Sequence, residues 1–310
     1  MLYFFLEWEV GMFQVFLSKI LELSSKGSFK EQTARVIDYV DILSNEDIKV
    51  IVKEIGTIPE CIKASSSEEK LFSKASDIIL ARCFRMLGLK SKSVNERADS
   101  ADVIAESVHH KYSLVADAKC FRMSRTAKNQ KDFKVAALSN WRGGENEYAV
   151  LVSPYFQYPK AESQIYKTAL DDNVCLLAWE HISILLDNNI SENENFSLET
   201  IWNSSSMIVR DSKVSYESAK CCFLPKINAF VAKKIGIVLS EFLKLLNDQK
   251  LFIIKRGSLE LEYCEKRIAE IKKYTHEQAI SELIKETKLE EKISVINSYL
   301  SSLEDVYEQS

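Results

Sequence analysis

The chain has 310 residues, of which 46% are hydrophobic, and its 41 Lys and Arg residues against 45 Asp and Glu give a formal net charge of −4. This length and composition can bury one large core, or a core with a helical extension. Seven cysteines without any C-x-x-C spacing, and four histidines without metal-ligand spacing, argue against a disulfide framework and a zinc site and favour the reducing cytoplasm.

The N-terminal stretch MLYFFLEWEVGMFQVFLSKILEL is the one part of the chain that suggests a membrane segment. Glu7 and Glu9 interrupt it, no basic leader precedes the apolar run, and no small-residue cleavage site follows. We therefore expect a buried amphipathic helix here and no membrane association.

Two further helices are predicted before residue 90. One begins at Ser44, and a longer one runs from a capping box of Ser66 and Glu69 to near Gly88. The longer helix carries the acids Glu69 and Asp77. Capping and solvent exposure are the expected roles of these acids, with an accessory role at a metal site as the alternative.

The next stretch, DVIAESVHHKYSLVADAK, predicts a β-hairpin, because apolar residues alternate on both sides of His109-His110. If the turn centres on these two histidines, the numbers of paired residues sum to 219. Asp102 then lies opposite Asp117 with Cβ atoms about 5 Å apart, and Lys119 shares the face of Asp117.

Two carboxylates at this separation repel by about 3 kcal/mol at an effective dielectric constant of roughly 20. A cation between Asp102 and Asp117, or protonation of one of them, would relieve this repulsion. Mg²⁺ suits the position, because it accepts carboxylate, water and phosphate oxygens and can activate a bound water. Lys119 could stabilise the charge of a transition state or orient the attacking water.

The D-x-K triplet at Asp117 has an alternative interpretation as part of a surface salt bridge. Three other triplets of this kind occur, at residues 47–49, 132–134 and 211–213. Asp117 differs from them because it ends an apolar strand and faces a second acid. A small shift of register would nevertheless turn Asp102 away, and His-His is not a favoured hairpin turn.

A basic segment follows the hairpin. Its cations recur at every third residue: Lys119, Arg122, Arg125, Lys128, Lys131 and Lys134. In a helix that begins after Ser124, they would occupy one broad side and could contact phosphates, while Asn129 and Gln130 could read base edges. The alternative is an ordinary solvated helix face.

The remainder of the chain predicts an α/β core followed by helices. Residues 148–154 and 174–178 are apolar runs typical of buried central strands, and a helix is expected from Trp179. Residues 191–220 are rich in Ser, Asn and acids and are expected to form a loop. Residues 225–310 have helical periodicity and could form a dimer interface, embrace DNA or simply pack against the core.

Specific runs of residues carry a family resemblance. The strand at Asp102, the LVADAK of the following strand and the run SRTAKNQKDFK resemble the HindIII group of type II restriction endonucleases, in the PD-(D/E)xK nuclease superfamily. Three other runs share this likeness: EKLFSKASDIILA, YFQYPKAESQIYK and LAWEHISILL. The resemblance implies a restriction-endonuclease-like α/β fold, with a mixed sheet flanked by helices and a helical C-terminal extension.

The resemblance also implies a domain plan. Residues 1–190 would form the nuclease core with its N-terminal helices, and residues 191–224 a polar connecting segment. Residues 225–310 would form a helical extension for dimerisation or for embracing DNA. The likeness begins near residue 9 or later, so Met12 is an alternative natural start, with residues 1–11 as an extension.

Individual roles follow from the resemblance by position. Asp102 and Asp117 correspond to the metal-binding acids, Lys119 to the motif lysine, and the carbonyl of Ala118 to an additional metal ligand. Ala101 replaces the usual proline, which is not a ligand. The expected DNA-binding residues are Arg122, Arg125, Lys128, Asn129 and Lys131.

The function implied by the resemblance is Mg²⁺-dependent cleavage of double-stranded DNA at a palindrome, the sequence AAGCTT. A homodimer would cut both strands, in cells that also contain a partner DNA methyltransferase. Two alternatives remain at this stage: a repair or junction nuclease with the same core, and a noncatalytic DNA-binding protein in which the acids form only a charge cluster.

Overall fold

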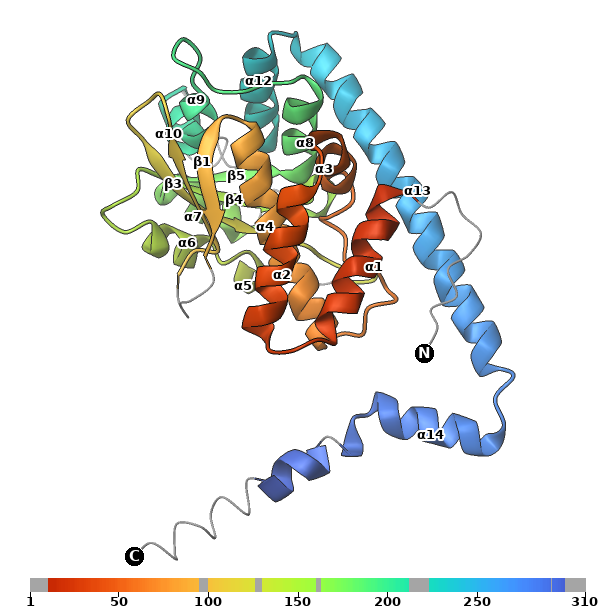
Figure 1. Cartoon of the computed structure of the whole chain (residues 1–310). Helices are drawn as coiled ribbons and strands as arrows, with labels where there is room; N and C mark the ends of the chain where they lie inside the picture. Colours follow the sequence, from red (N-terminus) through yellow and green to blue (C-terminus); the bar gives the residue numbers. More distant parts are fainter. Residues whose placement is uncertain are drawn as a thin grey trace, which may run out of the picture. The chain divides into compact units, whose positions relative to one another are not determined.

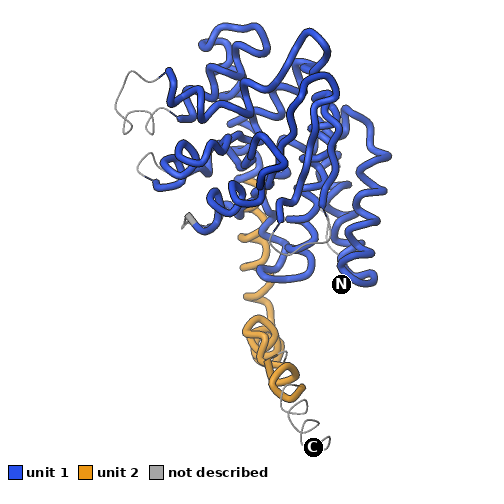
Figure 2. Tube along the Cα trace, turned by 90° about the vertical axis from the view of Figure 1, so that its left-hand side faces the viewer, with its two compact units in different colours: residues 1–257 blue, residues 258–310 orange. Residues whose placement is uncertain are grey.

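The computed structural model describes residues 11–94, 100–125, 130–159, 163–211, 223–290 and 292–298. The chain divides into two compact units, residues 1–257 and 258–310 (Figure 2). The first unit contains a mixed sheet flanked by helices, as the sequence predicts (Figure 1). In the second unit the described elements are helical.

Five strands form one sheet in the order β1-β2-β3-β4-β5. They are β1 (Leu89–Ser93), β2 (Val103–Ser107), β3 (Ser113–Ala118), β4 (Tyr148–Ser153) and β5 (Val174–Ala178). The first three are antiparallel neighbours, whereas β3, β4 and β5 run parallel. Every residue of β4 and β5 is buried. Both faces of these parallel strands are covered, which explains their nearly continuous apolar sequence.

The hairpin of β2 and β3 has the predicted register. Val103 pairs with Ala116, so the numbers of paired residues sum to 219. Continued by one residue, this register places Asp102, just before β2, across from Asp117 in β3. The two predicted acids therefore reach the same end of the sheet.

Helices account for most of the remaining described elements. They are α1 (Met12–Ser24), α2 (Phe29–Ile42), α3 (Asn45–Val52), α4 (Ser67–Met86), α5 (Gln130–Phe133), α6 (Val135–Arg142), the 3₁₀ helix η1 (Tyr155–Gln157), α7 (Gln164–Asp171), α8 (Trp179–Asp187), α9 (Glu199–Trp202), α10 (Ser204–Asp211), α12 (Phe223–Ile235), α13 (Leu239–Ile271) and α14 (His276–Glu286). Helix α4 packs on β1, β2 and β3, whereas α6 packs on β3, β4 and β5. At the start of α4, the Ser66 side chain accepts a hydrogen bond from the backbone N–H of Glu69, which is one half of the predicted capping box, whereas the Glu69 side chain accepts from the N–H of Ser65.

The N-terminal helix is buried, as its apolar residues predict. Phe13, Phe16 and Ile20 of α1 are fully buried in the core of the first unit. Residues 1–10, which include Glu7 and Glu9, lie outside the described residues. Among the helices in the described ranges, none combines the length and apolar character needed to cross a membrane.

Two local predictions are wrong. The segment expected to be a loop contains α9 and α10, because Trp202 and Ile208 are spaced to enter the core although polar residues surround them. The single helix expected after Ser124 is also wrong, because the described helical residues that follow Ser124 are divided between two helices. The helical residues of the basic segment instead form α5 and α6, separated at Lys134, which has a left-handed φ of 49°.

The first compact unit extends beyond the expected nuclease core. It continues past residues 190 and 224 to residue 257, and it includes α9, α10 and α12. Helix α12 contacts β5, which joins this part of the chain to the sheet. The roles expected for residues 191–224 and 225–310 stay predictions.

Candidate active site

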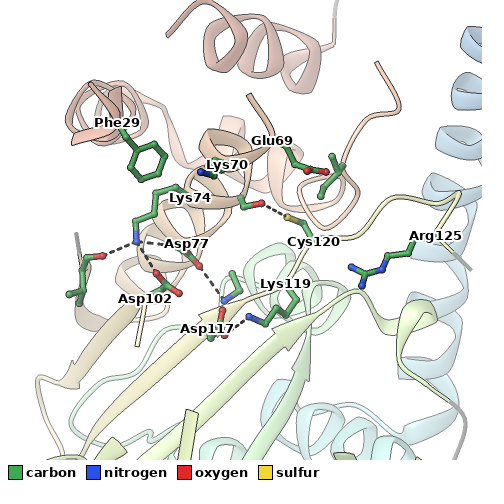
Figure 3. Close-up of a pocket in the computed structure, with 14 residues that line it drawn as sticks. Phe29, Glu69, Lys70, Lys74, Asp77, Asp102, Asp117, Lys119, Cys120 and Arg125 are labelled. Carbon is green, nitrogen blue, oxygen red and sulfur yellow. Dashed lines mark hydrogen bonds and ion pairs between the residues drawn. The ribbon is translucent and has the colours of Figure 1, made fainter. Parts of the chain in front are cut away.

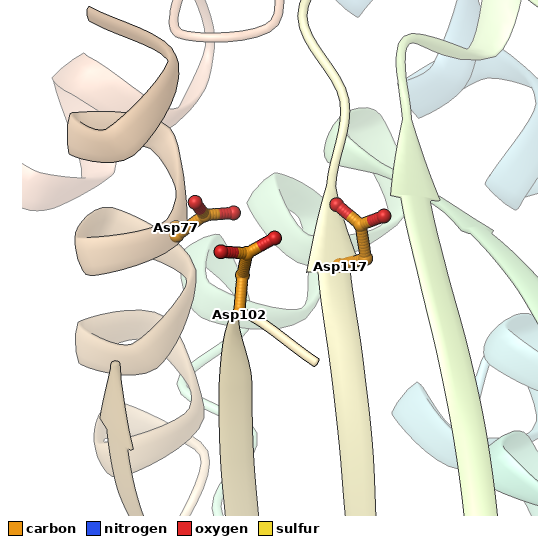
Figure 4. A group of neighbouring side chains, drawn as sticks. All are labelled: Asp77, Asp102 and Asp117. Carbon is orange, nitrogen blue, oxygen red and sulfur yellow. The ribbon is translucent and has the colours of Figure 1, made fainter. Parts of the chain in front are cut away.

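Three carboxylates meet at one end of the sheet (Figure 4). Asp102 precedes β2, Asp117 lies in β3 and Asp77 comes from α4. The ligand oxygens that they offer all lie within 4.8 Å of one another. The hairpin thus brings the predicted pair together, and the helix adds a third acid.

Asp77 occupies a position that the sequence does not favour for it. The expectation of solvent exposure is wrong, because Asp77 is only 6% exposed and its Oδ1 accepts a hydrogen bond from the Ala118 N–H at 3.3 Å. Burial raises the pKa of Asp77 well above its usual value, and the charges of Asp102 and Asp117 add to this effect. The one signal in the sequence is an acid within the apolar run ASDIILA, where a buried charge is rare.

Asp117 and Lys119 form an ion pair inside the site. Asp117 is 2% exposed, and its Oδ2 contacts the Lys119 ammonium, on the shared face that the strand period predicts. Burial raises the pKa of Asp117, and the Lys119 charge opposes that shift. Asp117 is therefore held in place but remains costly to ionise without a further cation.

The backbone around Lys119 is held by two neighbouring elements. The Lys119 N–H donates to the carbonyl of Val152 in β4 at 2.7 Å, and the Lys119 carbonyl accepts a hydrogen bond from Trp179 Nε1 at 3.0 Å. Trp179 is the first residue of α8 and is buried. Its contact with the lysine was not predicted, since 60 residues separate the two.

A second lysine, Lys74 of α4, also enters the cluster. Its ammonium lies 3.1 Å from Asp102 Oδ1, 3.7 Å from Asp77 Oδ2 and 2.7 Å from the carbonyl oxygen of Val94. The side chain is only 10% exposed. Each of the three acids therefore has an ammonium group within ion-pair distance.

The acids line an open pocket of about 770 Å³ (Figure 3). The ligands that the three acids offer are carboxylate oxygens, the type that hard cations such as Mg²⁺ prefer. Ala118, whose carbonyl is a predicted ligand, lines the same pocket. The residues present therefore fit a divalent cation. Glu69 also lines this pocket, but its backbone N–H donates to the capping Ser66 hydroxyl and its side chain accepts hydrogen bonds from an arginine.

That arginine, Arg122, faces the protein. Its guanidinium donates to Glu69 Oε1 at 2.8 and 3.1 Å and to the carbonyl of Pro59 at 3.0 Å, and its side chain is 14% exposed. Arg125, by contrast, lines the pocket with a side chain that is 43% exposed, where it pairs with Asp132. The two arginines of the basic segment thus have different environments.

The remaining predicted DNA-binding residues are only partly described. Lys131 is exposed at the start of α5. Lys128 and Asn129 lie outside the described residues, as do residues 126 and 127.

Comparison with known proteins gives two concordant matches. The model of the HindIII restriction endonuclease family matches residues 14–300 of the chain. The type II restriction enzyme HindIII of Haemophilus influenzae, strain Rd, is 42% identical over 287 residues, which cover 93% of this chain and 95% of that enzyme. Both matches span the hairpin, the basic segment and most of the C-terminal helices.

Proposed function

Because the chain belongs to the HindIII restriction endonuclease family and is a type II restriction endonuclease that cleaves DNA at a specific sequence, we propose that Asp77, Asp102 and Asp117, here called the acid cluster, act with Lys119 and Mg²⁺ to hydrolyse phosphodiesters. The observation that carries this proposal is the convergence of Asp77, Asp102 and Asp117 beside Lys119 in one open pocket. The family assignment favours restriction over a repair nuclease or a noncatalytic protein. The substrate that we propose is double-stranded DNA containing AAGCTT.

Each residue of the site has a distinct role in this proposal. Asp102 and Asp117 would hold the metal, with Asp77 and the Ala118 carbonyl as further oxygen donors. Bound Mg²⁺ would polarise the phosphodiester and lower the pKa of a bound water. The Lys119 ammonium, kept near Asp117, would donate to the phosphate oxygens as negative charge builds up on them. The contacts of its peptide with Val152 and Trp179 limit the movement of this lysine.

DNA contacts are proposed for the basic segment. Arg125 and Lys131 are exposed and can meet phosphates, and we assign the same role to Lys128. Asn129 is proposed to read a base edge. Arg122 can reach a phosphate only if it gives up its hydrogen bonds to Glu69, so the contact predicted for it requires a local rearrangement.

The assembly that we propose is a homodimer. One acid cluster serves one scissile phosphate, so cutting both strands of a palindrome in one encounter needs two clusters related by two-fold symmetry. Residues 225–310 are the proposed contributor to the interface or to the embrace of DNA. Action in the cytoplasm, alongside a methyltransferase that protects the same sequence, completes the proposal.

A plasmid with a single AAGCTT site tests the catalytic assignment. With Mg²⁺ the native chain should produce one linear product, whereas Asp117→Ala and Lys119→Ala should each abolish cleavage and leave the far-UV circular dichroism spectrum unchanged. Asp117→Ala removes a metal ligand, and Lys119→Ala removes transition-state stabilisation. Asp41→Asn, a change at a surface acid paired with Arg85, is the matched control and should cut normally. Near-normal turnover by either site variant would refute the assignment.

A further inference from the structure

The position of Lys74 is unusual for a lysine. Its ammonium is surrounded by oxygens from three separate parts of the chain: the Val94 carbonyl after β1, Asp77 on its own helix, and Asp102 before β2 (Figure 3). A buried lysine is costly unless its charge is paired and its protons are hydrogen-bonded. Here both conditions are met by the carboxylates assigned to the metal.

This set of contacts resembles the surroundings of a metal ion. A hard cation in a protein is also surrounded by carboxylate and carbonyl oxygens supplied by several segments. Lys74 is not part of the D-x-K motif, and its contacts are separate from the pairing of Lys119 with Asp117. We propose that Lys74 is the resting counter-ion of the acid cluster and lowers the affinity of the cluster for divalent metal in the absence of DNA.

The charges in the pocket give the physical reason. Even with all three acids ionised, three negative charges face the two ammonium groups of Lys74 and Lys119, so at most one net negative charge is left for an incoming Mg²⁺. A fixed ammonium within a few ångströms repels a divalent ion strongly in a partly buried site. The phosphate of bound DNA would add negative charge, so metal binding becomes favourable once substrate is present. Lys74 would thereby couple metal binding to DNA binding.

The inference rests on the proposed metal site, and it makes a prediction that does not require cleavage. Lys74→Met preserves an unbranched side chain of similar length and removes the charge. Its affinity for Mn²⁺ without DNA, measured by the electron paramagnetic resonance signal of free Mn²⁺, should rise by about tenfold or more. Calorimetry with Ca²⁺ measures the coupling between metal binding and DNA binding. Addition of DNA should increase the affinity for Ca²⁺ less in this variant than in the native chain.

Lys70→Met is the matched control. Lys70 lies one turn earlier on α4 and lines the same pocket, but it is exposed, so its charge is screened by solvent. This variant should keep Mn²⁺ affinity within about twofold of the native value. Lys74→Arg, which retains the charge, should also bind Mn²⁺ weakly.

A second neutral variant keeps the test informative if Lys74→Met does not fold. Lys74→Gln removes the charge but retains a donor for the Val94 carbonyl, and it should also bind Mn²⁺ more tightly than the native chain. Unchanged or weaker Mn²⁺ binding by the folded neutral variants would overturn the role of Lys74. Normal cleavage by Asp117→Ala would instead overturn the proposed function, so the two failures are distinguishable.

Discussion

Glu180 offers a test of how burial controls ionisation next to the active site. It lies in the first turn of α8, directly after Trp179, and its Oε2 accepts a hydrogen bond from the Tyr155 N–H at 2.8 Å. The side chain is buried, and this burial raises the pKa of Glu180 from 4.5 to about 7. The folded protein therefore holds this proton more tightly than the unfolded chain does.

The direction and size of the effect on stability follow from this shift. Below pH 4.5 the carboxyl is neutral in both states and adds no penalty. As the pH rises from 4.5 to 7, the unfolded chain loses the proton first, so the native state is progressively destabilised. A shift of this size corresponds to about 3 kcal/mol at pH 8, since each pKa unit is worth roughly 1.4 kcal/mol.

Glu180→Gln isolates this penalty. The amide carbonyl can still accept the Tyr155 N–H, but no charge has to be buried. We expect the free energy of unfolding to exceed that of the native chain by about 3 kcal/mol at pH 8, and the difference to vanish near pH 4.5. Urea titrations followed by tryptophan fluorescence at several pH values, in EDTA, would measure it.

An exposed glutamate provides the control for Glu180→Gln. Glu46, on the first turn of α3, has a side chain that is 80% exposed, so Glu46→Gln removes no buried carboxyl group and should change the free energy of unfolding at pH 8 far less than Glu180→Gln does. A Glu180→Gln variant that is less stable than the native chain at pH 8, or a difference independent of pH, would refute the reasoning.

Three further predictions concern metal, DNA and assembly. Asp77→Asn should weaken Mn²⁺ binding roughly 10- to 100-fold and slow cleavage, and native affinity would exclude Asp77 from the metal site. Lys131→Ala should reduce the salt dependence of DNA affinity by about one unit of slope, whereas Arg122→Ala should mainly lower stability, by about 1–3 kcal/mol, because it leaves Glu69 Oε1 without the guanidinium donors. If Lys131→Ala and Arg122→Ala lost DNA affinity equally at low salt, that result would contradict the distinction between them. Sedimentation should show a homodimer, and a monomer that releases nicked DNA would contradict the two-cluster arrangement.

Local pattern was sufficient for much of the core. The alternation of apolar residues around His109-His110 predicted the register of β2 and β3, because successive side chains point to opposite faces of a strand and a shift by one residue would exchange these faces. That register alone placed Asp102 near Asp117. The continuous apolar runs predicted β4 and β5, because a strand that is covered on both faces needs apolar residues on both.

Other parts of the fold depended on a few large residues within polar sequence. Residues 191–220 have the composition of a loop, yet Trp202 is fully buried and packs edge-on against Phe84, with ring centroids 5.6 Å apart. One such side chain buries enough apolar surface to order the short helices around it. Composition averaged over the segment conceals this contribution.

By itself, the sequence determined the strand register, the main helices and the pair of acids with their lysine, because these depend on neighbours along the chain. Only the tertiary structure decided that Asp77 and Lys74 join the cluster and that Trp179 holds the peptide of Lys119. Lys74 is 28 residues from Asp102, Asp77 is 41 from Ala118, and Trp179 is 60 from Lys119. Contacts across such separations form only when α4 and α8 pack against the sheet, because the periodicity of a helix says which face is buried but not which residues it meets.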